Sequence, residues 1–397
     1  MIILTLHMKY NHQRHIDNQI KQHFKKYKKV LILLGARQVG KTTLLKRLFP
    51  DAQYLLIDNE SIRNILERYD ISAYRQLINP NSKTVILDEI HLLANPGRAI
   101  KIIFDQLSSI NLIITGSSSL SIKNKTTESL AGRKIDYHLF PLTFSEYLYQ
   151  TGVETSLTTN VADNILSPKK GARLYPFDLK AIITNVLRYG LYPELVNSPS
   201  DEKYLENLSD SVVFKDLLEL KLIENRASAL ALLKLLAYQI GNLINYSEIG
   251  GRLNLDARTV KRYMDIFEQS FIVFRLYPFS TRPRDEIGKT PKIYFYDLGL
   301  RNALIGDFSE ISLRSDRGAL FENFIIGEFL KLNFYLDLGY KLNYWRLKQG
   351  SEIDLVLAKG EELTGVEIKY SDKKIGAAFT NRYPRANVRL VTSDNFY

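Results

Sequence analysis

The sequence predicts an α/β protein with a parallel sheet in its N-terminal part, a helical middle with a helix-turn-helix and a wing, and a second α/β domain at its C-terminus. Three observations predict this fold class. Uninterrupted apolar runs at residues 30–34, 84–88 and 111–115 are typical of parallel strands that helices cover on both faces. Helical patterns then fill most of residues 177–269. Strand-like runs return after residue 341.

The chain of 397 residues is long enough for two or three domains. We expect the parallel-sheet domain in residues 1–150 and a linker with a helical segment in residues 151–227. A winged-helix-like domain is expected in residues 228–300, and a second α/β domain in residues 301–397. The linker is placed where periodicity is lost, near residues 150–176.

The composition is typical of a water-soluble globular protein, with 45% apolar and 24% charged residues. The chain contains no cysteine, which excludes disulfides, thiolate metal sites and catalysis by a thiol. The apolar opening is too short for a signal peptide, and no run approaches the length that spans a bilayer. We therefore expect a cytoplasmic protein without a membrane partner.

The net charge of +11 is distributed unevenly. Residues 1–150 contain 21 Lys and Arg against 12 Asp and Glu, whereas the remaining residues contain 33 against 31. Much of the excess lies in residues 21–29, just before the first apolar run. Both a basic helix face in water and a contact with a polyanion such as DNA fit this pattern.

A glycine-rich loop joins the first apolar run to a helical run at residues 41–48. Its sequence fits G-x-x-x-x-G-K-[ST], in which the glycines let successive backbone amides point at a polyphosphate. The first turn of the helix adds unpaired amides and the positive end of its dipole. Lys41 is expected to reach the β- and γ-phosphates, and the hydroxyl of Thr42 to bind Mg²⁺. We predict ATP and Mg²⁺ as cofactors, with the nucleotide bound by Gly35, Ala36, Arg37, Gln38, Val39, Gly40, Lys41, Thr42 and Thr43.

Two acidic residues end the apolar run that begins at residue 84. Asp88 is expected to hold Mg²⁺ together with Thr42, and Glu89 to orient and deprotonate the attacking water. Two acids after a strand alone often cap a helix or lie in a turn. Because they follow the phosphate loop by some fifty residues, the pair predicts an ATP hydrolase instead of a passive nucleotide-binding protein.

Two further site residues are predicted from the next segment. We expect the strand at residues 111–115 to lie between the strands of the phosphate loop and of Asp88, with a polar residue beside the γ-phosphate. Ser117 is the candidate and Ser118 the next choice, although an ordinary serine-rich turn also fits. Arg133 is the candidate for an arginine that stabilises the transferring phosphoryl group, in its own or a neighbouring subunit, and Arg98 is the alternative.

These motifs give the chain a resemblance to a known group of proteins. The phrases GARQVGKTTLL, VILDEIHLL, ITGSSS, LAGRK and FPLTFSEYL resemble the archaeal and bacterial ATPases of the AAA+ superfamily that carry a C-terminal domain of unassigned function. Matching phrases in the second half are YGLYPELV, KIYFYDLGLRNAL, RGALFENFI, EIDLVL and GVEIKYS, so the resemblance covers nearly the whole chain. It implies an AAA+-type ATPase domain and a homo-oligomer, and it supports a winged helix in the middle.

The middle of the chain predicts three helices followed by two strands, the order of a helix-turn-helix with a wing. The helices are expected at residues 229–240, 247–253 and 257–269, and the wing strands at 271–276 and 292–296. Asp256 is expected to cap the third helix. That helix carries Arg258, Lys261 and Arg262 on one side. These three are candidate DNA contacts, and a purely structural role for this domain is the open alternative.

The C-terminal part combines a helix that contains Glu322 with strand-like runs at residues 341–347, 352–357 and 365–369. The alternation within the last run puts Glu367 and Lys369 on the same face, and Asp354 is expected on the partner strand. This set looks like the PD-(D/E)xK nuclease-like fold, which implies a second metal site at Glu322, Asp354, Glu367 and Lys369. The alternative is ordinary surface alternation, in which the carboxylates merely pair with the lysine.

We predict Mg²⁺-dependent ATP binding and hydrolysis coupled to conformational change, with DNA as the polymer acted upon. One alternative is a slow ATP-driven switch or scaffold that binds a protein partner. Another is a metal-dependent nuclease regulated by ATP.

Overall fold

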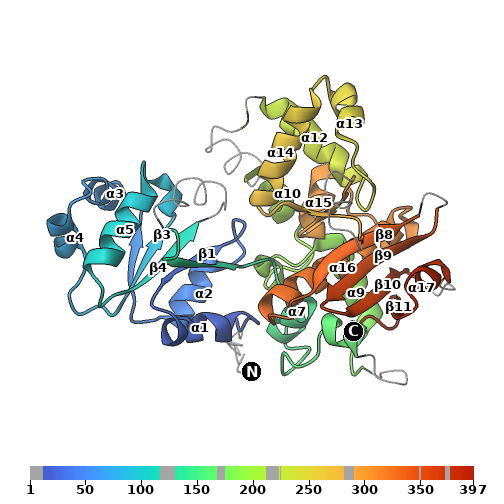
Figure 1. Ribbon diagram of the computed structural model, residues 1–397, viewed down its shortest axis with the longest axis horizontal. Helices are drawn as coiled ribbons and strands as arrows, with labels where there is room; N and C mark the ends of the chain where they lie inside the picture. Colours follow the sequence, from blue (N-terminus) through green and yellow to red (C-terminus); the bar gives the residue numbers. More distant parts are fainter. Residues whose placement is uncertain are drawn as a thin grey trace, which may run out of the picture.

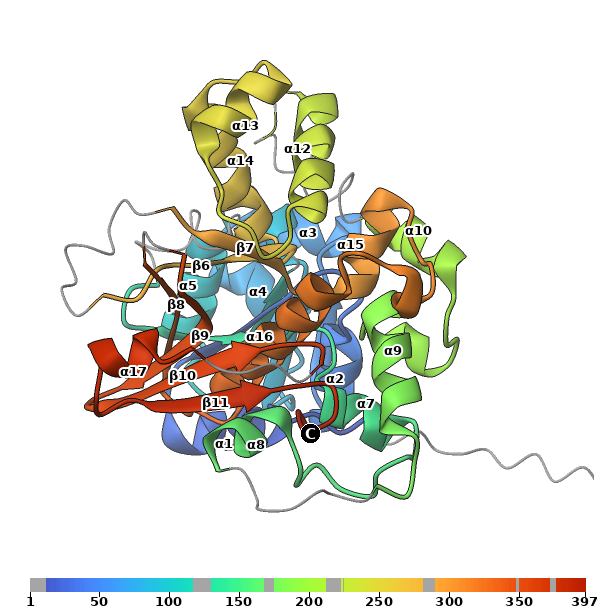
Figure 2. The same cartoon turned by 90° about the vertical axis from the view of Figure 1, so that its right-hand side faces the viewer.

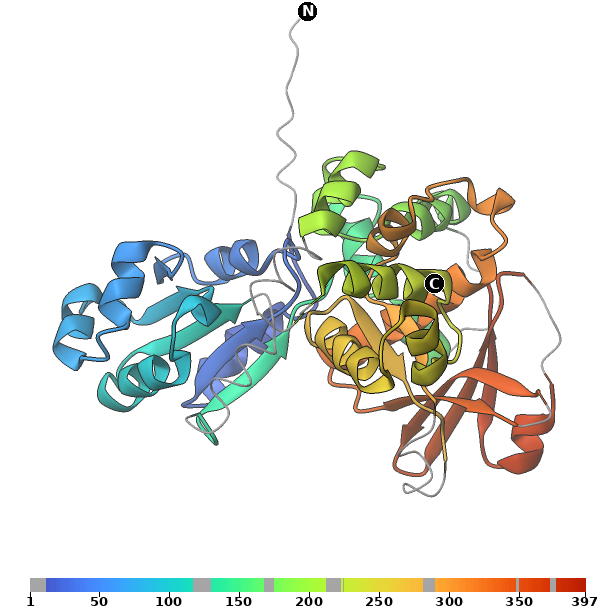
Figure 3. The ribbon, with the colours of Figure 1, turned by 90° about the horizontal axis from the view of Figure 1, so that it is seen from above.

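The computed structural model describes residues 12–116, 130–167, 175–211, 223, 225–280, 290–347, 350–371 and 376–397. Ser117 and Ser118, the predicted γ-phosphate sensors, lie outside these residues. The described chain forms two lobes, which separate clearly in the view from above (Figure 3). None of its described helices is long and apolar enough to cross a membrane.

The first lobe is built on a five-stranded parallel sheet with the strand order β2-β3-β4-β1-β5. The prediction of a parallel sheet is therefore confirmed, and β4 lies between β1 and β3 as expected. All five side chains of β1 are buried, as the uninterrupted apolar run requires. The strands are β1 (Val30–Leu34), β2 (Gln53–Leu56), β3 (Thr84–Asp88), β4 (Asn111–Gly116) and β5 (Lys134–His138).

Five helices of the first lobe surround this sheet (Figure 1). Asn and Asp side chains cap several of them, because a short acceptor side chain satisfies an amide that the first turn leaves free. The Asp70 carboxylate, for example, accepts from the amide of Ala73. The helices are α1 (Asp17–Lys26), α2 (Lys41–Leu48), α3 (Glu60–Leu66), α4 (Ile71–Leu77) and α5 (Pro96–Gln106).

The second lobe begins before residue 150, because α7 packs beside α16 and away from the parallel sheet (Figure 1). Its α8 was not predicted, since six residues are too few to show helical periodicity. The division of the chain into four domains stays a prediction. The helices of this lobe are α7 (Phe144–Gln150), α8 (Val161–Leu166), α9 (Leu179–Tyr189), α10 (Glu202–Ser211), α15 (Leu298–Ile305) and α16 (Arg317–Tyr335).

Three helices project from the second lobe, and two antiparallel strands lie at their base (Figure 2). Asp256 caps the third helix as predicted, because its carboxylate accepts from the amide of Thr259 at 2.8 Å. Asn254 ends the preceding helix in the left-handed region, at φ 52°, and so makes the turn between them. The elements, which follow the predicted order, are α12 (Arg226–Tyr238), α13 (Tyr246–Leu253), α14 (Ala257–Gln269), β6 (Val273–Leu276) and β7 (Lys292–Phe295).

The C-terminal sheet has four strands in the order β11-β10-β9-β8. The predicted hairpin between β9 and β10 is present, with Lys359 opposite Glu362. The parallel strand β11 was not predicted, because its mixed sequence NVRLV shows no long apolar run. The elements are β8 (Lys341–Arg346), β9 (Glu352–Lys359), β10 (Glu362–Ile368), α17 (Ala378–Arg382) and β11 (Asn387–Val391).

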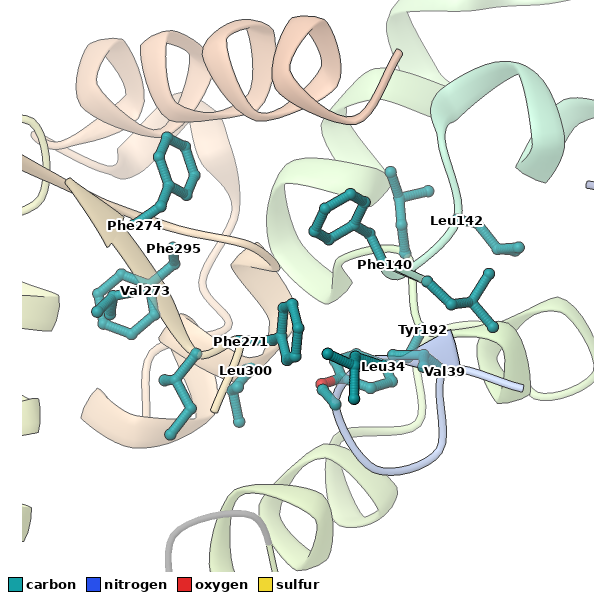
Figure 4. Close-up of a cluster of buried hydrophobic side chains, with 14 of the residues drawn as sticks. Leu34, Val39, Phe140, Leu142, Tyr192, Phe271, Val273, Phe274, Phe295 and Leu300 are labelled. Carbon is teal, nitrogen blue, oxygen red and sulfur yellow. The ribbon is translucent and has the colours of Figure 1, made fainter. Parts of the chain in front are cut away.

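One continuous core of buried apolar side chains extends through both lobes. Figure 4 shows its junction, where Leu34 and Val39 approach Phe140 and Leu142, with Phe271 beside them. The Phe140 ring stacks on Tyr296 at 5.2 Å between centroids and meets Phe271 edge-on at 6.1 Å. The loop that follows β1 therefore rests on the second lobe.

A buried charge reinforces this junction. Arg14, 5% exposed, donates to the carbonyls of Val39 at 3.2 Å and Phe140 at 2.8 Å. Its Nε lies 2.9 Å from the carboxylate of Glu146, which is fully buried. Burial opposes the charge of Glu146, but Arg14, His15 and two backbone amides outweigh it and lower the pKa of Glu146.

We predict that Arg14→Ala lowers the free energy of unfolding by about 3–5 kcal/mol, because it leaves the Glu146 charge buried without its partner. Urea denaturation near neutral pH measures this. Since the pKa of Glu146 is lowered in the folded state, the contribution is present above the ordinary Glu pKa and fades as pH falls through the lowered value.

Arg133→Ala is the matched control for this measurement. The Arg133–Asp105 ion pair is about two-fifths exposed on both sides, so its loss should cost less than about 1 kcal/mol. Equal losses for the two variants would contradict the importance of the buried pair.

Candidate functional site

The loop after β1 needs glycine at both of its motif positions. A Cβ added to Gly35 would lie 2.2 Å from the carbonyl oxygen of Leu139, so no side chain fits there. Gly40 has a φ of +92° and directly precedes α2, which begins at Lys41. The backbone amides at the start of α2 are thereby turned toward the loop, as phosphate binding requires.

The Lys41 side chain is 7% exposed and folds back across this loop. Its ammonium donates to the carbonyls of Gly35 at 2.8 Å and Ala36 at 2.9 Å. The side chain is thus held over the loop by two hydrogen bonds that a negatively charged phosphate can replace.

A cavity of about 690 Å³ opens at the loop and extends to the second lobe. The first lobe contributes Lys41, Thr42 and Glu89. The second lobe contributes Glu194 and Tyr204. A ligand that fills the cavity therefore touches both lobes. The remaining lining is His12, Arg14, Arg37, Gln38, Gly40, Thr43, Leu44, Leu142, Gln150, Pro193 and Asn197.

Asp88 lies at the end of β3, and its carboxylate joins α2 to β4. Thr42 donates its hydroxyl to one carboxylate oxygen of Asp88 at 3.1 Å, and Thr115 donates to the other. The Tyr54 hydroxyl donates to Thr42 at 3.3 Å. A hydroxyl and a carboxylate held together are hard oxygen donors, and this pair fits Mg²⁺.

Glu89 follows in the left-handed region, at φ 58°, which is uncommon for a residue with a side chain. This backbone leaves its carboxylate at the cavity, 3.1 Å from Nδ1 of His91. Burial opposes ionisation, but His91, Lys41 and Arg37 outweigh it and lower the pKa of Glu89. The carboxylate is therefore ionised near neutral pH and able to accept a proton.

Arg133 lies at the opposite edge of the sheet. The amide of Val30, at the start of β1, donates to the Arg133 carbonyl at 2.9 Å, whereas the loop follows Leu34. β1, which separates Val30 from Leu34, spans roughly 13 Å. The Arg133 side chain pairs with Asp105 at 3.1 Å. Contact with a nucleotide in the same chain is thus incompatible with this position, and a role in a neighbouring subunit stays a prediction.

The structure adds residues that the sequence reasoning missed. Thr115 holds Asp88, and its signal was available, because it is a polar residue near the end of an apolar strand. Arg14 and the short helix η2 (Pro193–Val196) gave no local signal, since they lie far from the loop in sequence. Arg98, the alternative to Arg133, lies over the ring of Tyr69 at 4.8 Å.

A second polar cluster lies on the C-terminal sheet, where the predicted residues come together. The ammonium of Lys369 is 2.9 Å from both Asp354 and Glu367. The amide of Ile368 donates to Asp354 at 2.8 Å, which fixes this carboxylate against β10.

Two residues that were not predicted, Lys292 and Glu352, complete this cluster. Lys292 lies 3.1 Å from Glu322 and also pairs with Glu352. Burial opposes its charge, but the two carboxylates outweigh this and raise the pKa of Lys292. Burial and the nearby Asp354 charge raise the pKa of Glu322. Among the described residues, no three His, Asp or Glu side chains are placed to hold a metal ion; here ammonium groups contact the carboxylates.

Three family models match separate segments of the chain. Residues 27–148, which contain the loop, Asp88 and Glu89, match a family described as an AAA domain. Residues 181–311 and 317–394 match two families that are each described as a domain of unknown function.

Relatives of low sequence identity match most of the chain. The uncharacterized protein MJ1637 of Methanocaldococcus jannaschii is 26% identical, over 91% of this chain and 80% of its own. An uncharacterized protein of Haemophilus influenzae is 23% identical, over 89% of this chain and 86% of its own.

Two solved structures are similar at low TM-scores. The signal transduction ATPase with numerous domains PH0952 of Pyrococcus horikoshii, which has a tetratricopeptide repeat sensor, gives a TM-score of 0.30 at 11% identity, with 81% of this chain and 47% of that chain covered. AMPPCP-bound DnaA from Aquifex aeolicus gives a TM-score of 0.31 at 12% identity, with 64% of this chain and 86% of that chain covered.

Proposed function

Because residues 27–148 match an AAA domain, we propose that this chain binds and hydrolyses ATP with Mg²⁺. Hydrolysis then changes the contacts between the two lobes. The observation that carries the proposal is the hydrogen bond between Thr42 and Asp88 at the cavity that Lys41 and Glu89 also line. Lys41, Thr42 and Glu89 thus line one cavity, and Asp88 is held against it through Thr42. DNA is the proposed polymer, and a homo-oligomer the proposed assembly.

In this mechanism the amides of the loop and of α2 bind the phosphates. Lys41 exchanges the carbonyls of Gly35 and Ala36 for phosphate oxygens. Thr42 and Asp88 would hold Mg²⁺, which neutralises phosphate charge when bound.

Glu89 acts on the attacking water, and Thr115 holds Asp88 in position. Glu89 orients the attacking water and takes its proton as the water oxygen bonds to the γ-phosphorus, while the bond from that phosphorus to the β–γ bridging oxygen breaks and ADP leaves. Thr115 keeps Asp88 in position through its hydroxyl.

The same cavity supports coupling between the lobes. Glu194 and Tyr204 face it from the second lobe, and Arg14 joins the loop to Phe140 and Glu146. Nucleotide binding and loss of phosphate would therefore alter contacts on both sides. The alternative, a slow switch for a protein partner, predicts a low ATPase rate that DNA does not change, whereas DNA-stimulated turnover favours DNA processing.

Glu89→Gln should keep ATP binding and lower turnover by about 10²–10⁴-fold, because the amide cannot accept the proton. Phosphate release measures turnover, and isothermal calorimetry measures the dissociation constant. Glu361→Gln, in the exposed turn before β10, is the matched control and should behave as wild type. Turnover at the wild-type rate in Glu89→Gln would refute the assignment.

Lys41→Ala should weaken ATP binding by about 10–100-fold, since one charge-assisted hydrogen bond is worth about 1.5–3 kcal/mol. Calorimetry with ATP and Mg²⁺ measures this affinity directly. Lys101→Ala removes an exposed lysine of α5 and serves as the control. An unchanged dissociation constant in Lys41→Ala would count against nucleotide binding at this loop.

A metal-dependent nuclease regulated by ATP is the second candidate function. The pattern that favours it is the placement of Asp354 on β9 beside Glu367 and Lys369 at the end of β10, with the partly buried Glu322 near Asp354. A metal ion would have to displace Lys369 from Asp354 or Lys292 from Glu322.

Plasmid and single strands incubated with Mg²⁺ or Mn²⁺ test the nuclease. Wild type should cleave, and Asp354→Ala should not, because it removes the carboxylate that accepts from the amide of Ile368 on β10 and from Lys369. Thermal melting shows whether the variant is folded. Cleavage that survives in the variant indicates a contaminant, and absence of cleavage in wild type rejects this candidate.

A further inference from the structure

A groove of about 1030 Å³ separates the beginnings of α13 and α14 from the beginning of β8. It belongs neither to the nucleotide cavity nor to the cluster around Asp354. Its walls come from the three-helix segment on one side and from the C-terminal sheet on the other. The residues that line it are Ile244, Asn245, Tyr246, Ser247, Ala257, Arg258, Lys261, Arg275, Tyr277, Thr290, Pro291, Lys341, Leu342 and Asn343.

We propose that this groove binds single-stranded nucleic acid. The proposal rests on the DNA-coupled ATPase function given above and names the place and form of the polymer. Cationic side chains contact the phosphates, and the exposed ring of Tyr277, beside the partly buried Tyr246, stacks on the bases.

The charge of the groove is positive and largely unbalanced. Arg258 and Lys261 enter from α14 and Lys341 from β8, and all three are exposed. Within the part of the chain that the structure describes, none of the three makes an ion pair. Arg275, in contrast, is held by Asp265 at 2.7 Å and by Glu268. No carboxylate is among the described lining residues, so the groove attracts a polyanion.

Two aromatic rings lie among these cations. Tyr277 is 39% exposed and lines the groove. Tyr246 lines it too, and its hydroxyl accepts from Arg275 at 3.4 Å. Aromatic faces next to free cations are the arrangement that binds single strands without sequence preference.

The two walls form one hydrogen-bonded unit. The amide of Tyr344 donates to the Tyr277 carbonyl at 3.0 Å, and the side chain of Asn343 donates to the same oxygen at 3.2 Å. β8 therefore stays opposite α14. A helix that reads duplex DNA must enter the major groove, which is about 12 Å wide, without a wall in front of it. The wall that β8 makes favours a single strand over a duplex.

The groove also leads toward the polar cluster of the C-terminal sheet. Thr290 and Pro291 line it, and the next residue is Lys292, which contacts Glu322 and Glu352. A strand in the groove would therefore pass beside this cluster.

Arg262 provides a matched control within α14. It does not line the groove, and its guanidinium lies over the ring of Tyr263 at 5.5 Å. The groove thus separates the three DNA candidates of this helix, with Arg258 and Lys261 inside and Arg262 outside.

Fluorescence anisotropy of the full-length protein with labelled oligothymidylate, and with a duplex of equal length, tests the proposal at two stated salt concentrations. Wild type should bind the single strand more tightly than the duplex. Arg258→Ala/Lys261→Ala and Lys341→Ala should each weaken binding by roughly tenfold or more and reduce the salt slope by about 1 per cation removed. Arg262→Ala should bind as wild type does.

Tyr277→Ala separates stacking from charge. It should weaken binding of oligothymidylate about fivefold or more and leave binding of inorganic polyphosphate, which has no bases, unchanged. Equal losses for both ligands, or none, would overturn the stacking role.

Several outcomes would refute single-strand binding in the groove and leave the proposed ATPase activity intact. These are duplex binding as tight as single-strand binding, unchanged affinity in the groove variants, and absence of nucleic-acid binding by a wild type that hydrolyses ATP. The basal ATPase rate of each variant, measured without DNA, should equal that of wild type and shows that it is folded. A wild type without ATPase activity would instead refute the proposed function.

Discussion

The buried guanidinium of Arg14 is the contact on which the geometry of the phosphate loop depends. It binds the carbonyl of Val39 within the loop, the carbonyl of Phe140 after β5, and the carboxylate of Glu146 in α7. Taking two charges out of water costs several kcal/mol each, so such a pair persists only where every partner is in place. The loop is therefore positioned by the junction of the lobes as well as by its own glycines.

The helix α16 extends this dependence to the C-terminal sheet. Near its end, the Tyr335 hydroxyl accepts from the amide of Phe140 at 2.8 Å. One turn earlier Lys331 donates to the Leu142 carbonyl at 3.0 Å, and Glu328 accepts from the amide of Phe144 at 2.7 Å. The same helix of 19 residues, about 28 Å long, also carries Glu322 in the polar cluster. The nucleotide cavity and that cluster are thus joined by one rigid element.

The sequence predicted those features that local patterns encode. β1, β3 and β4 follow from uninterrupted apolar runs, and α14 has the predicted bounds because Asp256 caps an amphipathic helix. The contact between Asp354 and Lys369 follows from strand alternation and a hairpin.

Contacts between distant segments were not predictable in this way. Arg14 contacts residues that lie 126 and 132 positions further along the chain, and Lys292 contacts Glu322 on a different element. No spacing of residues in the sequence predicts these two contacts. Arg133 lies far from the loop of its own chain, because it precedes β5, which runs parallel to β1, and the loop follows the other end of β1. Such information exists only after the strands are assembled.

Because the two lobes share one core, the part of the chain that can fold by itself is longer than the first lobe. The segment that matches an AAA domain begins at residue 27 and ends at 148, so it lacks Arg14. Cut at those limits, it would expose Phe140 and Leu142 to water and leave Glu146 without its partner. The stability of the first lobe should accordingly depend on its contact with the second. The stretch that can be recognised in the sequence is shorter than the stretch that can fold.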